Sequence, residues 1–381
     1  MGYSKRVLSA LALITLSSSA IAVPFTFDAR TLGMGGVSVA TANLATAAWA
    51  NPSMLTRQKI DDDFALLIGA GAFIRDNENL IGDIDDFQSA NDRLEAGDPT
   101  GLFEMIGIVG GIEGKVIAPE ATVPLALGIA FESFSMAVSV RADAIAGGTV
   151  TDISANVTDE NFNILNVSGV MATEFAVSFA RDFELFERRV SIGIKPKVVD
   201  LQAFSFRESI LTVDAGLDNV TTQDDKVDLG NFPTFDVGLA MDLSENWLLG
   251  LNITNLLTDQ FEVGAQTLNF DTAVKIGVAY HNNWMTVAMD YDLTENQPLL
   301  PGDDFDGLKT RNVNIGAEFS AGDYVHLRVG AAQNLAGNIS TGAKDTQYTV
   351  GIGFWLGFNL DIAAIVTENS AGGMLQTGFS F

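Results

Sequence analysis

The chain has 381 residues, of which 47% are hydrophobic and 18% are charged, and this balance excludes an intrinsically disordered protein. Its 48 acidic residues outnumber its 21 basic residues and give a net charge of −27, which argues against a nucleic-acid partner because phosphates need cations. There is no cysteine and there are only two histidines, so disulfides, thiolate metal sites and histidine-based catalysis have few residues to use. We therefore expect no cofactor, no bound metal and no enzymatic activity.

The first 22 residues have the features of a secretory signal peptide. Lys5 and Arg6 precede an apolar stretch over 7–16, and the segment ends with Ala-Ile-Ala at 20–22. The apolar stretch is too short to span a bilayer, and small residues before the cleavage point are typical of exported proteins. We expect cleavage before Val23; the alternative is an uncleaved membrane anchor.

Residues 31–56 form a long uncharged stretch, yet their composition is unsuited to lipid. Glycines, asparagines and a proline interrupt it, and each polar group buried in lipid would need an internal partner. We expect a glycine loop, a short alanine-rich helix near 37–50 and a stop at Asn51-Pro52. The sequence thus predicts a hatch over 23–58, held inside a polar enclosure. The candidate hatch residues are Gly33, Gly35, Gly36, Asn51 and Pro52.

A two-residue alternation of apolar and polar side chains dominates the rest of the chain, and this period is typical of β-strands with two different faces. In 325–330, for example, valine and leucine alternate with histidine, arginine and glycine. The segments that follow the pattern are 64–73, 122–131, 134–145, 167–182, 189–207, 232–242, 247–256, 271–281, 284–293, 311–320, 324–333, 346–356, 358–367 and 374–381.

The connections between these segments alternate in length. Every second connection is short, as at 132–133 and 282–283, whereas the others are longer, up to the segment 74–121, in which residues 85–96 have helical character. Transmembrane barrels have short periplasmic turns, long outer loops and an even number of strands. The sequence therefore predicts an all-β fold, a transmembrane antiparallel β-barrel of about 14 strands over 59–381. The alternative is a soluble β-sandwich.

Charged residues gather on one face of the predicted strands. A lysine or arginine on the lipid face at mid-depth costs about 2–4 kcal/mol, so this face is expected to line the barrel interior. Glycines on the same face leave room for an enclosed segment or a narrow lumen. The candidate lumen-lining residues are Arg141, Lys195, Lys275, Asp290, Glu318, Arg328 and Asp361.

Other motifs have simpler explanations. The glycines at 33–36 lack the lysine and the strand–loop–helix context of a phosphate-binding loop. Acidic clusters at 61–63, 83–86, 214–228 and 303–306 do not match the spacing of a calcium-binding loop. We expect these clusters to lie in solvated loops.

The chain ends in Gln-Thr-Gly-Phe-Ser-Phe, with Phe379 and Phe381 at alternating positions. This ending resembles the C-terminal signal of bacterial outer-membrane barrels, which engages the barrel assembly machinery. We expect the last strand to close against the first strand, with its apolar face in outer-membrane lipid.

Residues near both ends of the chain resemble known families. Residues 29–36, followed by Asn51-Pro52-Ser53, resemble the N-terminal segment of barrels related to the long-chain fatty-acid transporter FadL, in which a hatch folds into a fourteen-stranded barrel. Ser53 stands where that family usually has alanine. Residues 327–330, 348–353 and 360–363 resemble the closing strands of the conjugal transfer TraF-like family. A thioredoxin-like protein shares the TraF name, but this chain has no Cys-x-x-C motif.

These resemblances imply a non-enzymatic protein in the outer membrane of a Gram-negative bacterium, and they leave two functions open. The first is a surface or accessory component of the TraF-like kind, with a plugged lumen and an envelope partner protein. The alternative is a FadL-like channel for hydrophobic small molecules. The channel hypothesis predicts an apolar pocket near the outer loops and a gap or kink in the barrel wall.

Overall fold

The computed structural model describes residues 28–57, 63–76, 78–185, 187–213, 226–263, 266–296, 300, 309–322, 324–337, 346–366 and 370–381. The predicted signal peptide at 1–22 and the acidic segment 303–306 lie outside the described residues. Within the described part, none of the helices has the length and apolar character needed to cross a membrane.

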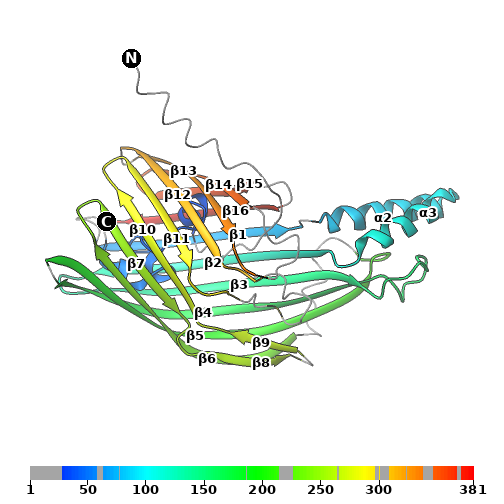
Figure 1. Cartoon of the computed structure of the whole chain (residues 1–381), viewed down its shortest axis with the longest axis horizontal. Helices are drawn as coiled ribbons and strands as arrows, with labels where there is room; N and C mark the ends of the chain where they lie inside the picture. Colours follow the sequence, from blue (N-terminus) through cyan, green and yellow to red (C-terminus); the bar gives the residue numbers. More distant parts are fainter. Residues whose placement is uncertain are drawn as a thin grey trace, which may run out of the picture.

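Within these residues, fourteen strands form one closed barrel, and every pair of neighbouring strands is antiparallel (Figure 1). The barrel strands are β1 (Phe64–Arg75), β2 (Val116–Ala130), β3 (Ser135–Thr151), β4 (Ile164–Leu185), β5 (Arg188–Ser209), β6 (Lys226–Asp242), β7 (Trp247–Thr254), β10 (Ala273–His281), β11 (Met285–Asp292), β12 (Asn312–Ala321), β13 (Val325–Asn334), β14 (Thr346–Trp355), β15 (Asn359–Val366) and β16 (Ser370–Ser380). Each of the predicted segments overlaps one of these strands. The predicted all-β, fourteen-stranded antiparallel barrel is therefore confirmed.

The barrel closes between its first and last strands. β1 pairs with β16 from Ala65–Ser380 to Arg75–Ser370. Beyond the strand end, Phe64 N donates to Phe381 O over 2.9 Å and Phe381 N donates to Phe64 O over 3.1 Å, while the two rings stack at 4.9 Å. The last residue of the chain therefore takes part in the contact between β1 and β16 that closes the barrel, which we call the seam.

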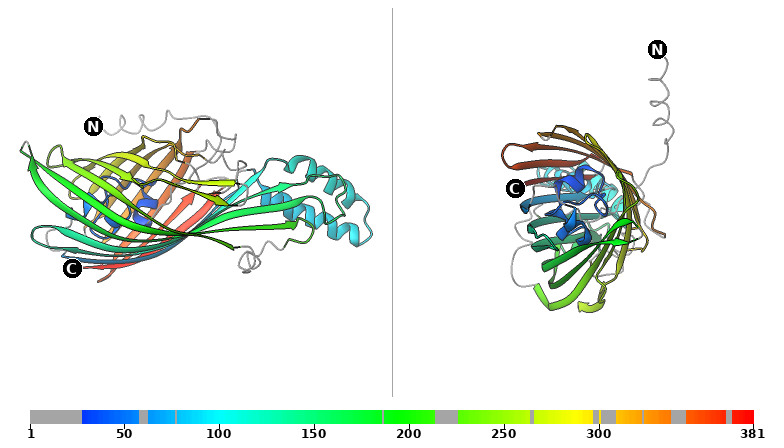
Figure 2. Two further views of the ribbon diagram at one scale, coloured as in Figure 1. Left: turned by 90° about the horizontal axis from the view of Figure 1, so that it is seen from below. Right: turned by 90° about the vertical axis from the view of Figure 1, so that its left-hand side faces the viewer.

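The strands on one side of the barrel are longer than the alternation predicted. β2 begins at Val116 instead of residue 122, and β4 and β5 each have 22 residues, whereas β7 has 8. The extensions stand beyond the other strands and carry two helices, α2 (Leu80–Glu95) and α3 (Thr100–Ile112), as Figure 2 shows. α2 includes residues 85–96 of the helical prediction except Ala96.

The helices bury the apolar residues that the extended strands would otherwise expose. Phe87 and Met105 of α2 and α3 are fully buried in one cluster with Val150 of β3 and Leu165 of β4. The side-chain amide of Gln88 donates to the carbonyls of Ile210 and Val213 beyond β5. The two helices therefore pack on the extended strands and share a hydrophobic core with them.

One hairpin was missed by the sequence analysis. β8 (Asp259–Val263) and β9 (Gln266–Phe270) pair only with each other and form a small separate sheet between β7 and β10. Phe232 of β6 contacts Phe270 and Phe261 edge-on, with ring centroids 5.1 and 6.1 Å apart. The hairpin therefore folds back onto the inner face of the wall.

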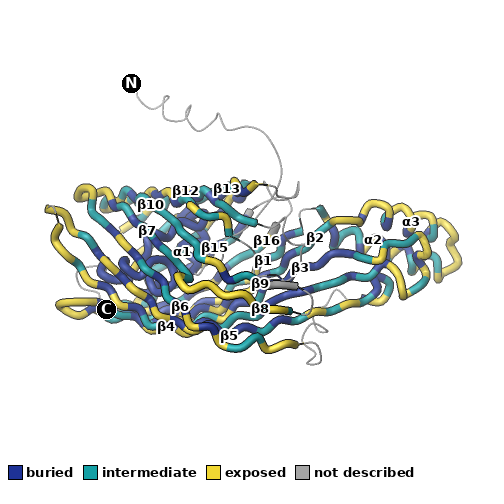
Figure 3. The backbone as a smooth tube through the Cα atoms, turned by 60° about the horizontal axis from the view of Figure 1, so that its bottom comes forward, coloured by how far each residue is buried: buried dark blue, intermediate teal, exposed yellow. Residues whose placement is uncertain are grey.

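Apolar side chains cover the outer surface of the barrel, and aromatic pairs gather at the end with the short turns. The pairs are Phe131–Phe134, Trp247–Tyr280, Trp284–Phe319 and Phe358–Phe379. Figure 3 shows buried and more exposed residues alternating along the strands. An apolar band edged by aromatic side chains is typical of a barrel wall that faces lipid.

Candidate functional site

The described part of the hatch, residues 28–57, lies inside the barrel (Figure 2, right). It contains one short helix, α1 (Ala29–Gly33), and two 3₁₀ helices, η1 (Thr46–Ala48) and η2 (Pro52–Thr56). The helix expected near 37–50 is wrong, since only 46–48 are helical there. Pro52 also begins a helical turn instead of ending one. Asn51 caps that turn by accepting from Ser53 N, and proline at the first helical position is a start signal.

The physical reason for the missing helix lies in the barrel wall. Asp290 on β11 accepts hydrogen bonds from the backbone N–H of Ser38 and Val39, over 2.7 and 3.0 Å. Asn51 Nδ2 donates to the carbonyl of Val39 over 2.8 Å. These contacts hold the backbone of 38–39 in turns, and such tertiary contacts override the helix propensity of the alanines.

Charged groups fix α1 to the neighbouring strands β12, β13 and β15. Arg30 Nη2 and Nε donate to the two carboxylate oxygens of Glu318 on β12 over 2.8 and 2.9 Å. Glu318 also accepts from Arg328, which in turn pairs with Asp361 over 2.5 Å. Burial would lower the pKa of Arg30, but the carboxylate of Glu318 outweighs it and the pKa is raised. Arg30 therefore stays charged.

Wall glycines let the hatch backbone lie directly on the strands. A Cβ at Gly250 would come within 2.6 Å of Val39 O, and one at Gly128 within 2.6 Å of Leu44 O. The other wall glycines whose Cβ would press on hatch atoms are Gly193, Gly238, Gly277, Gly316, Gly330 and Gly351.

The hatch glycines face the same constraint. A Cβ at Gly33 would lie 3.0 Å from Gly351 Cα, and one at Gly35 would lie 2.6 Å from Ala331 N. Gly35 and Gly36 also have positive φ angles of 72° and 88°, which side-chain-bearing residues rarely adopt.

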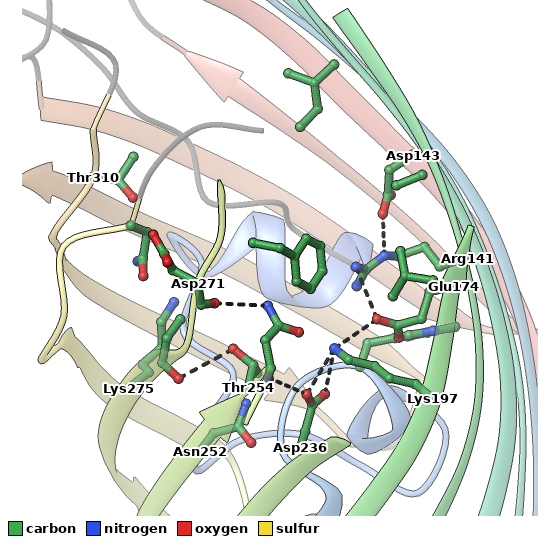
Figure 4. Close-up of a pocket in the computed structure, with 18 of the residues that line it drawn as sticks. Arg141, Asp143, Glu174, Lys197, Asp236, Asn252, Thr254, Asp271, Lys275 and Thr310 are labelled. Carbon is green, nitrogen blue, oxygen red and sulfur yellow. Dashed lines mark hydrogen bonds and ion pairs between the residues drawn. The ribbon is translucent and has the colours of Figure 1, made fainter. Parts of the chain in front are cut away.

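A cavity of about 290 Å³ lies in the lumen beside the hatch (Figure 4). Ser38, Trp49 and Ala50 of the hatch line it on one side. Gly193 of β5 and Gly238 of β6 contact the hatch. The next inward-facing residues on these two strands are Lys195 and Asp236, which lie two positions farther from the short turns. The cavity therefore begins where the hatch ends and extends towards the long loops.

Four charged side chains on three adjacent strands form a closed cluster in the cavity wall, which we call the ion ring: Glu174, Lys195, Lys197 and Asp236. Lys195 Nζ lies 2.9 Å from Glu174 and 2.8 Å from Asp236, and Lys197 Nζ lies 3.1 and 2.9 Å from the same two carboxylates. Figure 4 shows Lys197 between Glu174 and Asp236. Each cation thus contacts both acids, and the four charges cancel.

Neighbouring cations are paired as well. Arg141 Nε lies 2.6 Å from Asp143 and Nη2 lies 3.8 Å from Glu174, while Lys275 lies 3.2 Å from Asp292. Among the described residues, every lysine or arginine that lines the cavity has an acidic partner. The cavity thus presents no unpaired positive charge.

Apolar side chains line one side of the cavity nearer the long loops. Ile145, Val170 and Val199 line it from β3, β4 and β5, and Phe270 lines it from the hairpin β8–β9. Val199 pairs with Phe232 in the β5–β6 register, two residues beyond Lys197. Arg75 and Glu120, which pair with each other, line the cavity beside Ile145, so this part of the cavity combines an apolar side with polar groups.

The wall beside the ion ring has a hollow on its outer surface. β4–β5 pairing reaches Ala176–Lys197, is interrupted at Pro196 and resumes at Phe179–Ile194. Proline has no N–H to donate to the ladder. The hollow, of about 450 Å³, is lined by Val138, Phe175 and Val198 on the lipid side, and Lys197 lines both it and the lumenal cavity.

The seven candidate lumen residues divide among three places. Arg141, Lys195 and Lys275 line the cavity, Asp290 holds the hatch turn, and Glu318, Arg328 and Asp361 anchor α1. Sequence analysis missed Glu174, Trp49 and Asn252, although the alternation in β4 places Glu174 on the face of Ala172 and Ala176. Phe379 and Phe381 lie at the seam and are exposed on its surface.

A closed fourteen-stranded barrel that encloses its N-terminal segment has the fold of the FadL-like outer-membrane barrels. The chain is similar to the Ralstonia pickettii toluene transporter TbuX (TM-score 0.55, 11% identity, covering 93% of this chain and 98% of that chain). It is also similar to a Pseudomonas aeruginosa FadL homologue (0.53, 10%, 95% and 99%) and to the Pseudomonas putida toluene transporter TodX (0.51, 13%, 92% and 95%). At these identities the likeness shows the fold alone.

The chain belongs to the family described as "F plasmid transfer operon, TraF, protein", whose model matches residues 48–292. No curated protein matches the chain. The resemblances to the TraF-like family and to FadL-related barrels are both confirmed.

Proposed function

We propose that the protein is a channel in the outer membrane of a Gram-negative bacterium, through which apolar or amphiphilic small molecules pass from the lumen into the lipid. One observation carries the proposal: Lys197 lines both the lumenal cavity and the wall hollow, beside the interrupted ladder. The hatch contacts the wall at β12 through Arg30 and at β5 through Thr56, so it fills the direct path along the barrel axis. The interrupted ladder at Pro196 is the alternative path.

The proposed route runs along the apolar side chains of the lumen. A molecule that arrives from the long loops first meets Ile145, Val170, Val199 and Phe270, and apolar surface loses contact with water there. It then reaches the wall beside Pro196 and leaves towards Val138 and the lipid. The channel hypothesis expected an apolar pocket and a gap in the wall. The apolar side of the cavity supports the first expectation, and the interrupted ladder at Pro196 supports the second.

The similar structures support this proposal. Two of them are toluene transporters, and a third is a FadL homologue. The fold likeness alone assigns no substrate, so the cavity and the hollow carry the proposal.

Filling the wall hollow tests it. Val138→Trp places a large side chain in the hollow, and Val329→Trp makes the same change on the lipid-facing side of β13, where Val329 is 49% exposed. In cells that depend on this barrel, uptake of radiolabelled toluene is expected to fall about tenfold with Val138→Trp and to stay unchanged with Val329→Trp. Equal uptake by Val138→Trp and the native protein, at equal barrel levels, would refute passage through this wall.

A second candidate function is an accessory role at the cell surface with an envelope partner. Membership of the TraF family and the exposed apolar face of α3 favour it, since Phe103 is 75% exposed. Phe103→Glu combined with Ile106→Lys tests it, since both side chains are exposed and the core of the helical pair stays intact. Reduced plasmid transfer with unchanged toluene uptake would assign the helices to the accessory role.

A further inference from the structure

The lumenal cavity combines a neutralised charged zone, a few unpaired polar atoms and an apolar wall. This combination discriminates among small molecules by their polar group. We infer that the preferred ligand is a neutral molecule with an apolar body and a hydroxyl group, such as a phenol, which binds more tightly than a plain hydrocarbon or a carboxylate. This inference rests on the proposed channel function and specifies its substrate class.

The closed ion ring argues against an anionic ligand. Both lysines already contact Glu174 and Asp236, all within 3.1 Å, and Arg141 is held by Asp143. A carboxylate would have to displace one of these buried acids from its lysines. Removing one partner of a buried ion pair is strongly unfavourable, because the remaining charge is left uncompensated.

Unpaired polar atoms argue against a plain hydrocarbon. Within the part of the chain that the structure describes, Asn252 Oδ1, Asn255 Oδ1 and Trp49 Nε1 are buried and have no hydrogen-bond partner, and all three residues line the cavity. Trp49 is 2% exposed and Asn252 is 6% exposed. A hydrocarbon in the cavity would leave these atoms unpaired, which is costly in a site shielded from water.

A hydroxyl group matches the chemistry of these atoms. The two amide oxygens are acceptors and the indole N–H is a donor, whereas a hydroxyl group both donates and accepts. The apolar remainder of the ligand can lie against Ile145, Val170 and Phe270. A cavity of about 290 Å³ is at the small end of ligand pockets, so a molecule with one ring is a suitable size.

Three probes of similar size separate the alternatives: p-cresol, p-xylene and 4-methylbenzoate. They share a methyl-substituted ring and differ in one group, which is a hydroxyl, a methyl or a carboxylate. Calorimetric titration of the purified full-length barrel should give p-cresol about tenfold tighter binding than p-xylene, and tighter binding than 4-methylbenzoate.

Two variants connect the preference to the unpaired atoms. Asn252→Leu removes an acceptor at similar volume, and Trp49→Phe removes the donor. Each should lower the p-cresol preference by about three- to tenfold while p-xylene binding changes less than about twofold, which shows that the cavity stays folded. Asn161→Leu, on an exposed loop, is the matched control and should bind like the native protein.

Each other outcome overturns the inference in a distinguishable way. Equal or tighter binding of p-xylene, or tightest binding of 4-methylbenzoate, refutes the hydroxyl preference and leaves the channel proposal standing. If no probe binds, the hydroxyl preference fails. If the Val138→Trp uptake experiment also shows no effect, the channel proposal fails with it.

Discussion

The guanidinium of Arg30, on the hatch, and the carboxylate of Glu318, on the barrel wall, form two parallel hydrogen bonds of 2.8 and 2.9 Å. The two residues are far apart in the sequence, yet this contact joins the first described helix to β12. Bidentate pairs of this kind fix orientation as well as position. The Arg30–Glu318 pair therefore anchors α1 of the hatch in one orientation, and releasing α1 requires breaking this pair.

Removing this anchor should open the lumen more often. Arg30→Met leaves Glu318 with Arg328 as its remaining cation, and a loss of about 2 kcal/mol shifts a two-state population about 30-fold. We expect many more open-channel events in planar bilayers. Arg207→Met is the control, because the pair of Arg207 with Asp152 is more than half exposed and such pairs contribute little. Identical event rates for both variants would contradict the anchoring role of Arg30.

A methyl group between wall and hatch should destabilise the barrel. Gly250→Ala places a Cβ 2.6 Å from Val39 O, and overpacking of this kind costs about 1–3 kcal/mol. Gly107→Ala, on the exposed face of α3 with no atom within 4 Å of its Cβ, should stabilise its helix by up to about 1 kcal/mol. Heat-modifiable mobility on gels measures both. A higher unfolding temperature for Gly250→Ala than for the native chain would show that the hatch moves away from the added methyl group without a loss of stability.

Deleting 28–56 should leave a foldable barrel with higher conductance. The strand ladder does not include these residues, so the wall keeps its backbone pairing. The hatch is held in the lumen by contacts with the wall, such as Ser38 with Asp290 and Asn51 with Leu239, and its removal leaves that space to water. Single-channel recording in planar bilayers measures the effect. Unchanged conductance of an assembled barrel would refute the plug but not the barrel.

Deleting Phe379–Phe381 should severely lower the amount of folded barrel. The deletion removes the stacked pair Phe64–Phe381, the two hydrogen bonds between these residues, and the end of the β1–β16 pairing at Ala65 and Leu66. Shortening the connection 214–225 should be tolerated, because loop closure depends only weakly on length. The heat-modifiable fraction in outer-membrane preparations quantifies both changes. Equal loss in the two variants would argue against a special role for the chain end.

The barrel was predictable from sequence because every second residue of a wall strand faces lipid and must be apolar. This requirement produces a two-residue alternation that is visible within each short segment of the sequence. The hatch was predictable as an enclosed segment but not in its conformation, since the turn at Ser38 depends on Asp290, which lies far away in the sequence. The partners in the ion ring could not be predicted either. Their pairing depends on strand register, and Glu174 resembles any other inward residue until β4 is aligned with β5.

The interruption at Pro196 also has a consequence for local stability. β12 and β13 pair without a break from Asn312–Asn334 to Ala321–Val325, whereas the pairing of β4 with β5 is lost at Lys195 and Pro196. Local opening is easiest where backbone hydrogen bonds are fewest. Amide hydrogens beside Pro196 should therefore exchange with solvent deuterium well before those in the middle of β12. The barrel wall would then be compliant beside Lys197, the residue that lines both the lumenal cavity and the hollow on the lipid side.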